Sequence, residues 1–264
     1  MDRQNHGCSS EFAGQVAVVT GAAQGIGQAI AEELQTRGAR LVLVDCNGPK
    51  VSATAASMHG PLGTPDSLVA DLANPAAITA LAAEFALLAP KIDILVNNAG
   101  IELDLPFGQI SAAAFDRVIA VNLRAPLLLS QALLPSFPQA GGVIVNVSSI
   151  HSSHAFANAI PYACSKAGMI ALTRNMALEL APRQIRVNAV CPGYIDTPLW
   201  DVWLRSAPDP EALAALTAAQ HPLGRRGLAA DVAGAVVYLA SPQAAWITGT
   251  NLVVDGGLTI RAHP

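Results

Sequence analysis

The chain has 264 residues, of which 52% are hydrophobic and 13% are charged, and its formal net charge is −4. This composition excludes a disordered chain, and because no basic patch stands out, nucleic acid is not an expected partner. The opening residues lack the apolar segment of a secretory signal, and no apolar run approaches the length of a membrane span. A soluble, cytoplasmic protein with no membrane partner is therefore predicted. The cysteines form no C-x-x-C pair, so neither a disulfide framework nor a zinc site is expected; they are Cys8, Cys46, Cys164 and Cys191.

Short apolar runs alternate with helical patterns along the chain. A strand is predicted at residues 16–20, followed by a glycine turn and a helix on which Ile26, Ile30 and Leu34 recur until Gly38 ends it. Asn74 and Pro75 are typical of the start of another helix. The remaining predicted strands are residues 41–45, 68–70, 92–96, 143–147, 185–190 and 252–254, and the remaining predicted helices are about 112–134 and 161–180.

The predicted strands are apolar throughout, as expected for strands that are covered on both faces. Strand and helix alternation of this kind is typical of an α/β fold with a doubly wound parallel sheet and helices on both faces. No repeat or long linker divides the chain. We therefore expect a flexible tail at residues 1–12 and one domain at residues 13–264.

A glycine-rich turn joins the first strand to the first helix, with the sequence Thr20-Gly21-Ala22-Ala23-Gln24-Gly25-Ile26-Gly27. A dinucleotide needs its pyrophosphate close to backbone N–H groups at a helix N-terminus, and glycines remove the Cβ atoms that would block this approach. The spacing is G-x-x-x-G-x-G and not G-x-G-x-x-G. A purely structural turn remains the alternative interpretation.

Asp45 closes the second predicted strand, 45 − 27 = 18 residues after Gly27. A carboxylate at this point accepts hydrogen bonds from ribose hydroxyls and repels a 2′-phosphate. No Lys or Arg lies at residues 22–24 or 46–47, where a 2′-phosphate would find a partner. NAD is therefore predicted over NADP, and the alternative is that Asp45 only ends a strand.

Tyr162 and Lys166 are four residues apart, so on a helix they lie on one face. The ammonium group favours the phenolate and is expected to lower the tyrosine pKa towards a range useful for proton transfer. Ser149 closely follows a predicted strand, at the sheet edge where such folds bind ligands. Residues 97–100 follow another strand, and Asn122 lies in an otherwise apolar helix.

At this point the sequence resembles the short-chain dehydrogenase/reductase family over nearly its whole length. The matching stretches are Thr20–Gly27, Asn97–Gly100, Asn122, Ser149, Tyr162 with Lys166, and Cys191-Pro192-Gly193. The resemblance implies a Rossmann-type sheet of about seven strands, a nicotinamide cofactor, and a homotetramer.

The resemblance also implies a role for each matching position. Tyr162 would be the general acid/base, Ser149 would hydrogen-bond the reacting oxygen, and Asn122 would position a proton-relay water. Lys166 would hold the nicotinamide ribose, and Asp71 and Leu72 would contact adenine. The further positions that would contact the cofactor are Gly21, Gln24, Gly25, Ile26, Gly27, Asn98, Ala99, Gly100, Pro192, Gly193, Ile195 and Thr197.

Residues 194–222 resemble the family's mobile substrate lid. Trp200 and Trp203 are expected to line the substrate pocket, and the alternative is that they pack a lid helix against the body. His151 and His154 resemble part of the pocket wall and are predicted to contact substrate, although plain surface exposure is an alternative. No acid or thiol accompanies the two histidines, so no metal site is predicted.

The substrate class is predicted from residues 197–200 and 222–225, which look like those of family members that oxidise sugars, polyols or other small secondary alcohols. The expected partner is thus a small molecule. Hydroxysteroid dehydrogenase and 3-oxoacyl-carrier-protein reductase are the enzymatic alternatives. A dinucleotide-binding regulator without catalysis is the non-enzymatic alternative, but such a protein would not need to keep both Tyr162 and Lys166.

Overall fold

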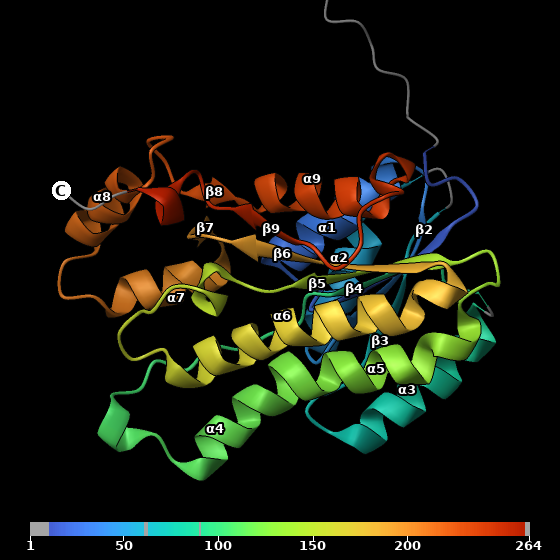
Figure 1. Cartoon of the computed structure of the whole chain (residues 1–264), viewed down its shortest axis with the longest axis horizontal. Coiled ribbons are helices and arrows are strands. Elements are labelled where there is room, and N and C mark those ends of the chain that lie inside the picture. Colours follow the sequence, from blue (N-terminus) through green and yellow to red (C-terminus); the bar gives the residue numbers. More distant parts are fainter. Residues whose placement is uncertain (1–10, 61–62, 90, 262–264) are drawn as a thin grey trace, which may run out of the picture.

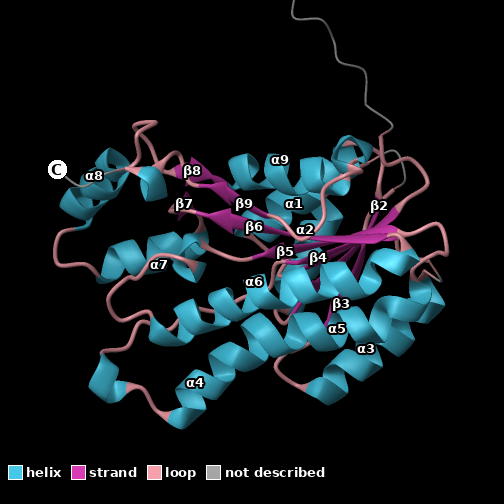
Figure 2. Ribbon diagram, viewed as in Figure 1, coloured by secondary structure: helices cyan, strands magenta, loops and turns pink. Residues whose placement is uncertain are grey.

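A computed structural model describes residues 11–60, 63–89 and 91–261. Its centre is a parallel sheet of seven strands in the order β3-β2-β1-β4-β5-β6-β9 (Figures 1 and 2). The strands are β1 Val16–Thr20, β2 Arg40–Asp45, β3 Asp66–Val69, β4 Ile94–Asn97, β5 Gly142–Val147, β6 Ile185–Pro192 and β9 Asn251–Val254. A separate pair is formed by β7 Ile195–Asp196 and β8 Gly227–Leu228.

Helices cover both faces of this sheet (Figure 1). They are α1 Gly25–Thr36, α2 Gly48–Ser57, α3 Pro75–Leu88, α4 Ala112–Ile119, α5 Ala125–Leu133, α6 Ile160–Leu180, α7 Pro198–Ser206, α8 Pro210–Gln220 and α9 Ala229–Ala240. One apolar core lies between the sheet and α1, α2 and α9, and a second lies between the sheet and α3, α5 and α6. The predicted doubly wound α/β fold with one sheet is therefore confirmed.

The chain reverses its direction across the sheet between β1 and β4. Strands β2 and β3 lie on one side of β1, and β4, β5, β6 and β9 lie on the other. Because the strands are parallel, the loops after β1 and β4 leave the same edge and diverge to opposite faces. This topological switch point is the expected ligand site of an open α/β sheet, and it positions the site described below.

Two predicted strands are shifted relative to the structure. The strand expected at residues 92–96 begins at Ile94. The N–H of Ile92 donates to the carbonyl of Ser136, outside the sheet. The N–H of Asp93 donates to the carbonyl of Val16, and its carbonyl accepts from the N–H of Val143, so that Asp93 lies at the end of the strand pairing. The strand expected at residues 68–70 is β3, which begins two residues earlier, at Asp66. Both shifts leave the buried apolar positions unchanged.

The long helix expected at residues 112–134 is interrupted by a π-helical turn, Ala120–Arg124. Pro126 lies in the first turn of α5 and has no N–H to donate to the carbonyl of Asn122, four residues before it, so a regular α-helical bond is lost there. The segment Ala112–Ser136 is long and apolar enough to cross a membrane by length and composition alone. Half of its most apolar window is buried inside the protein, as in a core helix.

The start of the domain differs from the prediction. Residues 1–10 of the predicted tail lie outside the described part of the chain. Phe12, however, is fully buried in the core, and Glu11 pairs with Arg37 at 3.0 Å. The fold therefore includes residues that we had assigned to the tail. Helices α2, α8 and α9 were not predicted, because their sequences are rich in small residues and carry little hydrophobic periodicity.

Candidate active site

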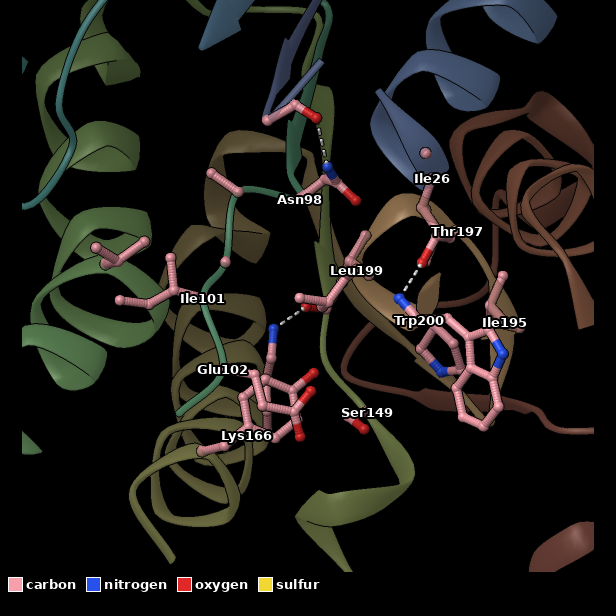
Figure 3. Close-up of a pocket in the computed structure, with 18 of the residues that line it drawn as sticks. Ile26, Asn98, Ile101, Glu102, Ser149, Lys166, Ile195, Thr197, Leu199 and Trp200 are labelled. Atoms are coloured by element: carbon pink, nitrogen blue, oxygen red, sulfur yellow. Dashed lines mark hydrogen bonds between the residues drawn. The ribbon is translucent and has the colours of Figure 1, made fainter. Parts of the chain in front are cut away.

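A cavity of about 880 Å³ runs along the carboxyl edge of the sheet, from the glycine turn to α6 and α7 (Figure 3). This is within the usual size range of cofactor and substrate pockets. The predicted site residues that line it are Gly21, Gln24, Gly25, Ile26, Gly27, Asp45, Asp71, Leu72, Asn98, Ala99, Gly100, Ser149, His151, Tyr162, Lys166, Pro192, Gly193, Ile195, Thr197, Trp200 and Trp203. Segments that are far apart in the sequence thus meet in one continuous space.

The glycine turn forms a tight cradle at one end of the cavity. Gly21 has φ +64°, and a Cβ atom added to it would lie 2.8 Å from the Cα of Ala99. At Gly27 an added Cβ would lie 2.1 Å from the carbonyl oxygen of Gly21. The amide of Asn98 donates to the carbonyls of Thr20 and Gly21 at 2.9 and 3.1 Å and holds the turn in place. The turn opens directly into the N-terminus of α1, so these residues fit the pyrophosphate of a dinucleotide.

Asp45 lies at the end of β2 and lines the cavity. Its carboxylate accepts hydrogen bonds from the N–H groups of Ala23 and Asn47 at 3.1 and 2.9 Å, so its position is fixed by the backbone on both sides. Carboxylate oxygens carry further lone pairs, and these remain available for ribose hydroxyls.

Two cations lie near this end of the cavity that the sequence analysis did not consider. The ammonium of Lys50, in the first turns of α2, donates to the side-chain oxygen of Gln24, which lines the cavity. Arg117 of α4 also lines the cavity and pairs with Asp71 at 3.1 Å. Neither residue is adjacent in sequence to the glycine turn or to Asp45, because α2 and α4 bring them to the cavity from farther along the chain.

Tyr162, Lys166 and Ser149 form one wall of the cavity. Tyr162 and Lys166 lie one turn apart on α6, with the ammonium 5.4 Å from the centre of the tyrosine ring. Lys166 is buried, and its ammonium donates to the carbonyl of Val147, the last residue of β5, at 2.8 Å. Ser149 follows the same strand. Strand β5 and helix α6 therefore position all three groups.

The electrostatics of Tyr162 differ from the prediction. Burial, followed by the Glu102 carboxylate, raises the pKa of Tyr162 above its ordinary value of 10.0, and the hydroxyl of Ser149 acts in the opposite direction. Burial lowers the pKa of Lys166 to about 8, while Glu102 acts to raise it. The expectation that Lys166 depresses the pKa of Tyr162 is not met in this structure, because burial and the Glu102 carboxylate raise that pKa.

Glu102 is the main site residue that the sequence analysis missed. It lines the cavity two residues after Gly100, and burial together with the nearby Asp104 raises the pKa of Glu102 from 4.5 to about 7. The Lys166 ammonium acts on it in the opposite direction. Its place just after β4 was a usable signal, since polar residues in that position lie at the ligand-binding edge of the sheet.

Glu102→Gln is expected to stabilise the protein at pH 8 but not at pH 5. Between its ordinary pKa of 4.5 and about 7, the folded protein keeps a proton on Glu102 that the unfolded chain has lost. The unfolding free energy of the wild type therefore falls as the pH rises through this window. The unfolding free energy of the glutamine variant does not fall in this way, because glutamine does not ionise. Thermal unfolding at both pH values tests it. An equal change in Tm at pH 5 and pH 8 would contradict it.

Asn122 does not line the cavity. It is fully buried in the π-helical turn, where its amide nitrogen donates to the carbonyl of Ile101 at 2.8 Å and to the hydroxyl of Ser165 at 3.0 Å. Its amide oxygen accepts from the N–H of Ile101 at 2.8 Å. The Asn122 side chain thus ties the loop after β4 to α6, which carries Tyr162 and Lys166.

The two histidines have different surroundings. The ring nitrogen Nδ1 of His151 lies 3.1 Å from the hydroxyl of Ser149, and its ring meets that of Tyr162 edge to face. Burial, with Lys166, lowers the pKa of His151 to about 4, so the ring is uncharged at neutral pH. His154 is exposed and does not line the cavity, which favours the alternative of plain surface exposure: its ring lies 3.0 Å from the hydroxyl of Ser153.

The two tryptophans of α7 pack on Tyr194. The ring centres of Tyr194 and Trp200 are 5.4 Å apart, and those of Trp200 and Trp203 are 4.7 Å apart. Both tryptophans also line the cavity. Lining the pocket and packing the lid helix are therefore not exclusive, since these rings do both.

The chain is similar over most of its length to proteins named as dehydrogenases and reductases. A family model described as enoyl-(acyl carrier protein) reductase matches residues 21–259. A D-threitol dehydrogenase of Mycolicibacterium smegmatis is 38% identical over 94% of this chain and 94% of its own length. A cis-4-hydroxycyclohexanecarboxylate dehydrogenase of Sinomonas cyclohexanicum is 42% identical over 94% of this chain and 98% of its own. Proteins named as 3-oxoacyl-[acyl-carrier-protein] reductases and a 3beta-hydroxysteroid dehydrogenase also match.

Among solved structures, a candidate NAD(P)-dependent gluconate 5-dehydrogenase from Beutenbergia cavernae superposes with a TM-score of 0.87. It is 35% identical, and the match covers 96% of this chain and 99% of that one. Its crystal contained NADP at low occupancy. This fold therefore holds a nicotinamide dinucleotide in a protein of closely similar shape.

Proposed function

Because the chain belongs to the short-chain dehydrogenase/reductase family, we propose that it is an NAD-dependent dehydrogenase of a sugar or polyol. The family assignment makes it an oxidoreductase that acts on a CH–OH group with a nicotinamide cofactor. The observation that carries the proposal is the cavity itself, in which the glycine cradle is continuous with Tyr162, Ser149 and Lys166. The D-threitol dehydrogenase similarity and the resemblance of residues 197–200 to sugar and polyol dehydrogenases support the substrate class.

The proposed mechanism assigns a task to each polar group of the wall. In oxidation, Tyr162 is the base that takes the proton of the substrate hydroxyl, and the hydroxyl of Ser149 donates a hydrogen bond to the same oxygen. Because burial raises the pKa of Tyr162, the positive charges of Lys166 and of a bound oxidised nicotinamide would have to favour its phenolate form. Lys166 binds the nicotinamide ribose and keeps a positive charge near Tyr162. The bound nicotinamide supplies the hydride acceptor for the carbinol carbon. In reduction, Tyr162 returns the proton.

The remaining residues hold this geometry. The neutral ring of His151 packs on Tyr162 and contacts Ser149, so it orients both groups without adding charge. We assign to Asn122 the support of the loop after β4, which it joins to α6 through two hydrogen bonds to Ile101 and one to Ser165, in addition to the expected relay of protons. We further propose that residues 194–222 close over the substrate as a lid.

The preference for NAD rests on Asp45. Its carboxylate lines the cavity at the end of β2, where it accepts hydrogen bonds from ribose hydroxyls and repels a 2′-phosphate. The strongest observation in favour of NADP is Lys50. Its ammonium donates to Gln24 and would be a partner for a 2′-phosphate. We favour NAD because Asp45 is held in place by two backbone hydrogen bonds, while Lys50 is a surface side chain.

The proposal is tested by reduction of NAD⁺ and NADP⁺ with a panel of aldoses, polyols, hydroxysteroids and 3-hydroxyacyl thioesters. We expect NAD⁺ with an aldose or polyol to give the highest kcat/KM. Asp45→Ser should lower kcat/KM for NAD⁺ by roughly 10- to 100-fold, since it removes a charge-assisted hydrogen bond. Lys50→Ala is the matched variant and should leave NAD⁺ use unchanged. Turnover only with NADP⁺, lost in Lys50→Ala, would overturn the cofactor assignment, and turnover only with steroids or thioesters would overturn the substrate class.

We also propose that the protein works in the cytoplasm, as its composition and unpaired cysteines predict, and that it forms a homotetramer, which is carried over from the family. Apolar side chains that are exposed on the single chain support an assembly, among them Trp246, Ile260 and Leu223.

A further inference from the structure

Two carboxylates lie on the substrate side of the cavity without protein partners. Glu102 and Asp104 follow β4 and line the cavity together with Tyr162 and Lys166. Neither carboxylate forms a hydrogen bond or an ion pair within the described ranges 11–60, 63–89 and 91–261. Glu102 is half-buried, and a carboxylate withdrawn from water is costly unless something pairs with it. Asp104 is exposed, so the unpaired Glu102 carboxylate beside the reacting groups is the one that indicates a role in binding, with Asp104 beside it.

The same part of the cavity offers no cation for an acidic ligand. Among the described residues that line it, the two cations are Lys166 and Arg117. Lys166 is buried and its ammonium is bonded to the carbonyl of Val147, while Arg117 is paired with Asp71, after β3. His151 is uncharged, because burial lowers its pKa to about 4. A substrate carboxylate placed near Tyr162 would thus meet two like charges and find no partner.

The opposite side of the substrate space is aromatic. Trp200, Trp203, Tyr194 and Phe156 all line it, and Tyr194 packs against each of the other three, with ring centres 5.4, 6.3 and 6.2 Å away. Figure 3 shows Glu102 and Trp200 on different sides of Ser149. Aromatic faces pack well on the C–H groups of a sugar or polyol, and carboxylates accept hydrogen bonds from hydroxyl groups.

We propose that Glu102 and Asp104 form a hydroxyl-binding subsite that selects uncharged polyhydroxy substrates and rejects alcohols that carry a carboxylate. The inference rests on the proposed function and narrows its substrate class. It places this chain with enzymes of neutral alcohols, as the D-threitol dehydrogenase is named, and apart from enzymes named for hydroxycyclohexanecarboxylate or gluconate. Glu102 and Asp104 would accept hydrogen bonds from the substrate hydroxyls that do not react.

The selection should depend on pH in a defined direction. Burial and Asp104 raise the pKa of Glu102 to about 7, so Glu102 is mostly neutral at pH 6 and ionised at pH 8.5. The other groups that act on it are Lys166 and Tyr162 on α6 and Tyr194 after β6. Of these, Lys166, whose pKa burial lowers to about 8, gains a positive charge on going from pH 8.5 to pH 6, and this acts in the same direction as the loss of charge on Glu102. Discrimination against carboxylate substrates should therefore weaken as the pH falls, because the repulsion fades with the charge on Glu102.

The experiment compares matched substrate pairs. For each alcohol that the wild type oxidises, kcat/KM is measured for it and for the analogue with a carboxylate in place of a hydroxymethyl group, such as galactose and galacturonate. We expect the neutral member to be favoured by about 100-fold at pH 8.5, as is typical of like charges at a binding site. In Glu102→Gln the ratio of kcat/KM for the neutral alcohol to kcat/KM for its carboxylate analogue should fall by about tenfold or more. The value for the carboxylate should rise and that for the neutral alcohol should fall. Asp104→Asn should act in the same direction and is the second variant.

Controls separate this inference from the proposed function. Glu84→Gln, an exposed acid on α3 outside the cavity, removes the same charge and should leave the ratio unchanged. NADH binding, measured by fluorescence, shows that each variant is folded. The inference is overturned if the ratio in both site variants equals that of the wild type, or if an amino sugar exceeds its neutral parent by more than about tenfold, which would indicate a cation site. Absence of aldose and polyol turnover would defeat the proposed function alone, because the carboxylate test applies to whichever alcohol is oxidised.

Discussion

Tyr162→Phe is expected to lower kcat by roughly 10³- to 10⁴-fold while NADH binds as in the wild type. The phenylalanine ring keeps the packing against His151, so the fold and the cofactor end of the cavity should not change. What is lost is the group that exchanges a proton with the reacting oxygen. Steady-state rates with the best substrate, together with NADH titration by fluorescence, check both parts of this expectation.

The matched control for this variant is Tyr238→Phe. Tyr238 lies on α9 and is 44% exposed, and it does not line the cavity. Its loss of a hydroxyl group should leave kcat within a factor of about two, because surface substitutions change little. Near-wild-type turnover in Tyr162→Phe would contradict the role of Tyr162 in proton transfer, whatever the substrate.

Gly27→Ala is expected to weaken NADH binding by about 100-fold and to lower the unfolding free energy by about 2 kcal/mol. The added Cβ would lie 2.1 Å from the carbonyl oxygen of Gly21 and 2.5 Å from the amide nitrogen of Asn98. Both neighbours belong to the cradle, and one is backbone, so the turn itself must move. Fluorescence titration and denaturant unfolding measure the two effects.

Gly234→Ala is the matched control on α9. No atom lies within 4 Å of a Cβ added to Gly234, and the residue is exposed inside a helix. Alanine there should raise the unfolding free energy by about 0.5–1 kcal/mol, through helix propensity, and should not affect NADH binding. If Gly27→Ala bound NADH as tightly as the wild type does, the glycine turn would not be the pyrophosphate cradle.

Much of the fold was predictable because its signals are local. The apolar strands and the glycine turn are each determined by neighbouring residues, so their order along the chain indicates a doubly wound sheet. Helices α8 and α9 were not predicted, since alanine at five of the 11 positions of α8 and five of the 12 of α9 reduces the contrast between a buried and an exposed face. The π-helical turn depends on Pro126, whose missing N–H disturbs a helix that otherwise looks regular.

The sequence by itself determined which groups can transfer a proton and bind a dinucleotide, because residue type and spacing along one strand or helix decide that chemistry. Only the tertiary structure decided their surroundings. It brings Glu102 beside Tyr162 and Lys50 beside Gln24, and it leaves His154 outside the cavity. The physical reason is that burial and the effect of one charge on another depend on distance in space, which loops between distant strands set.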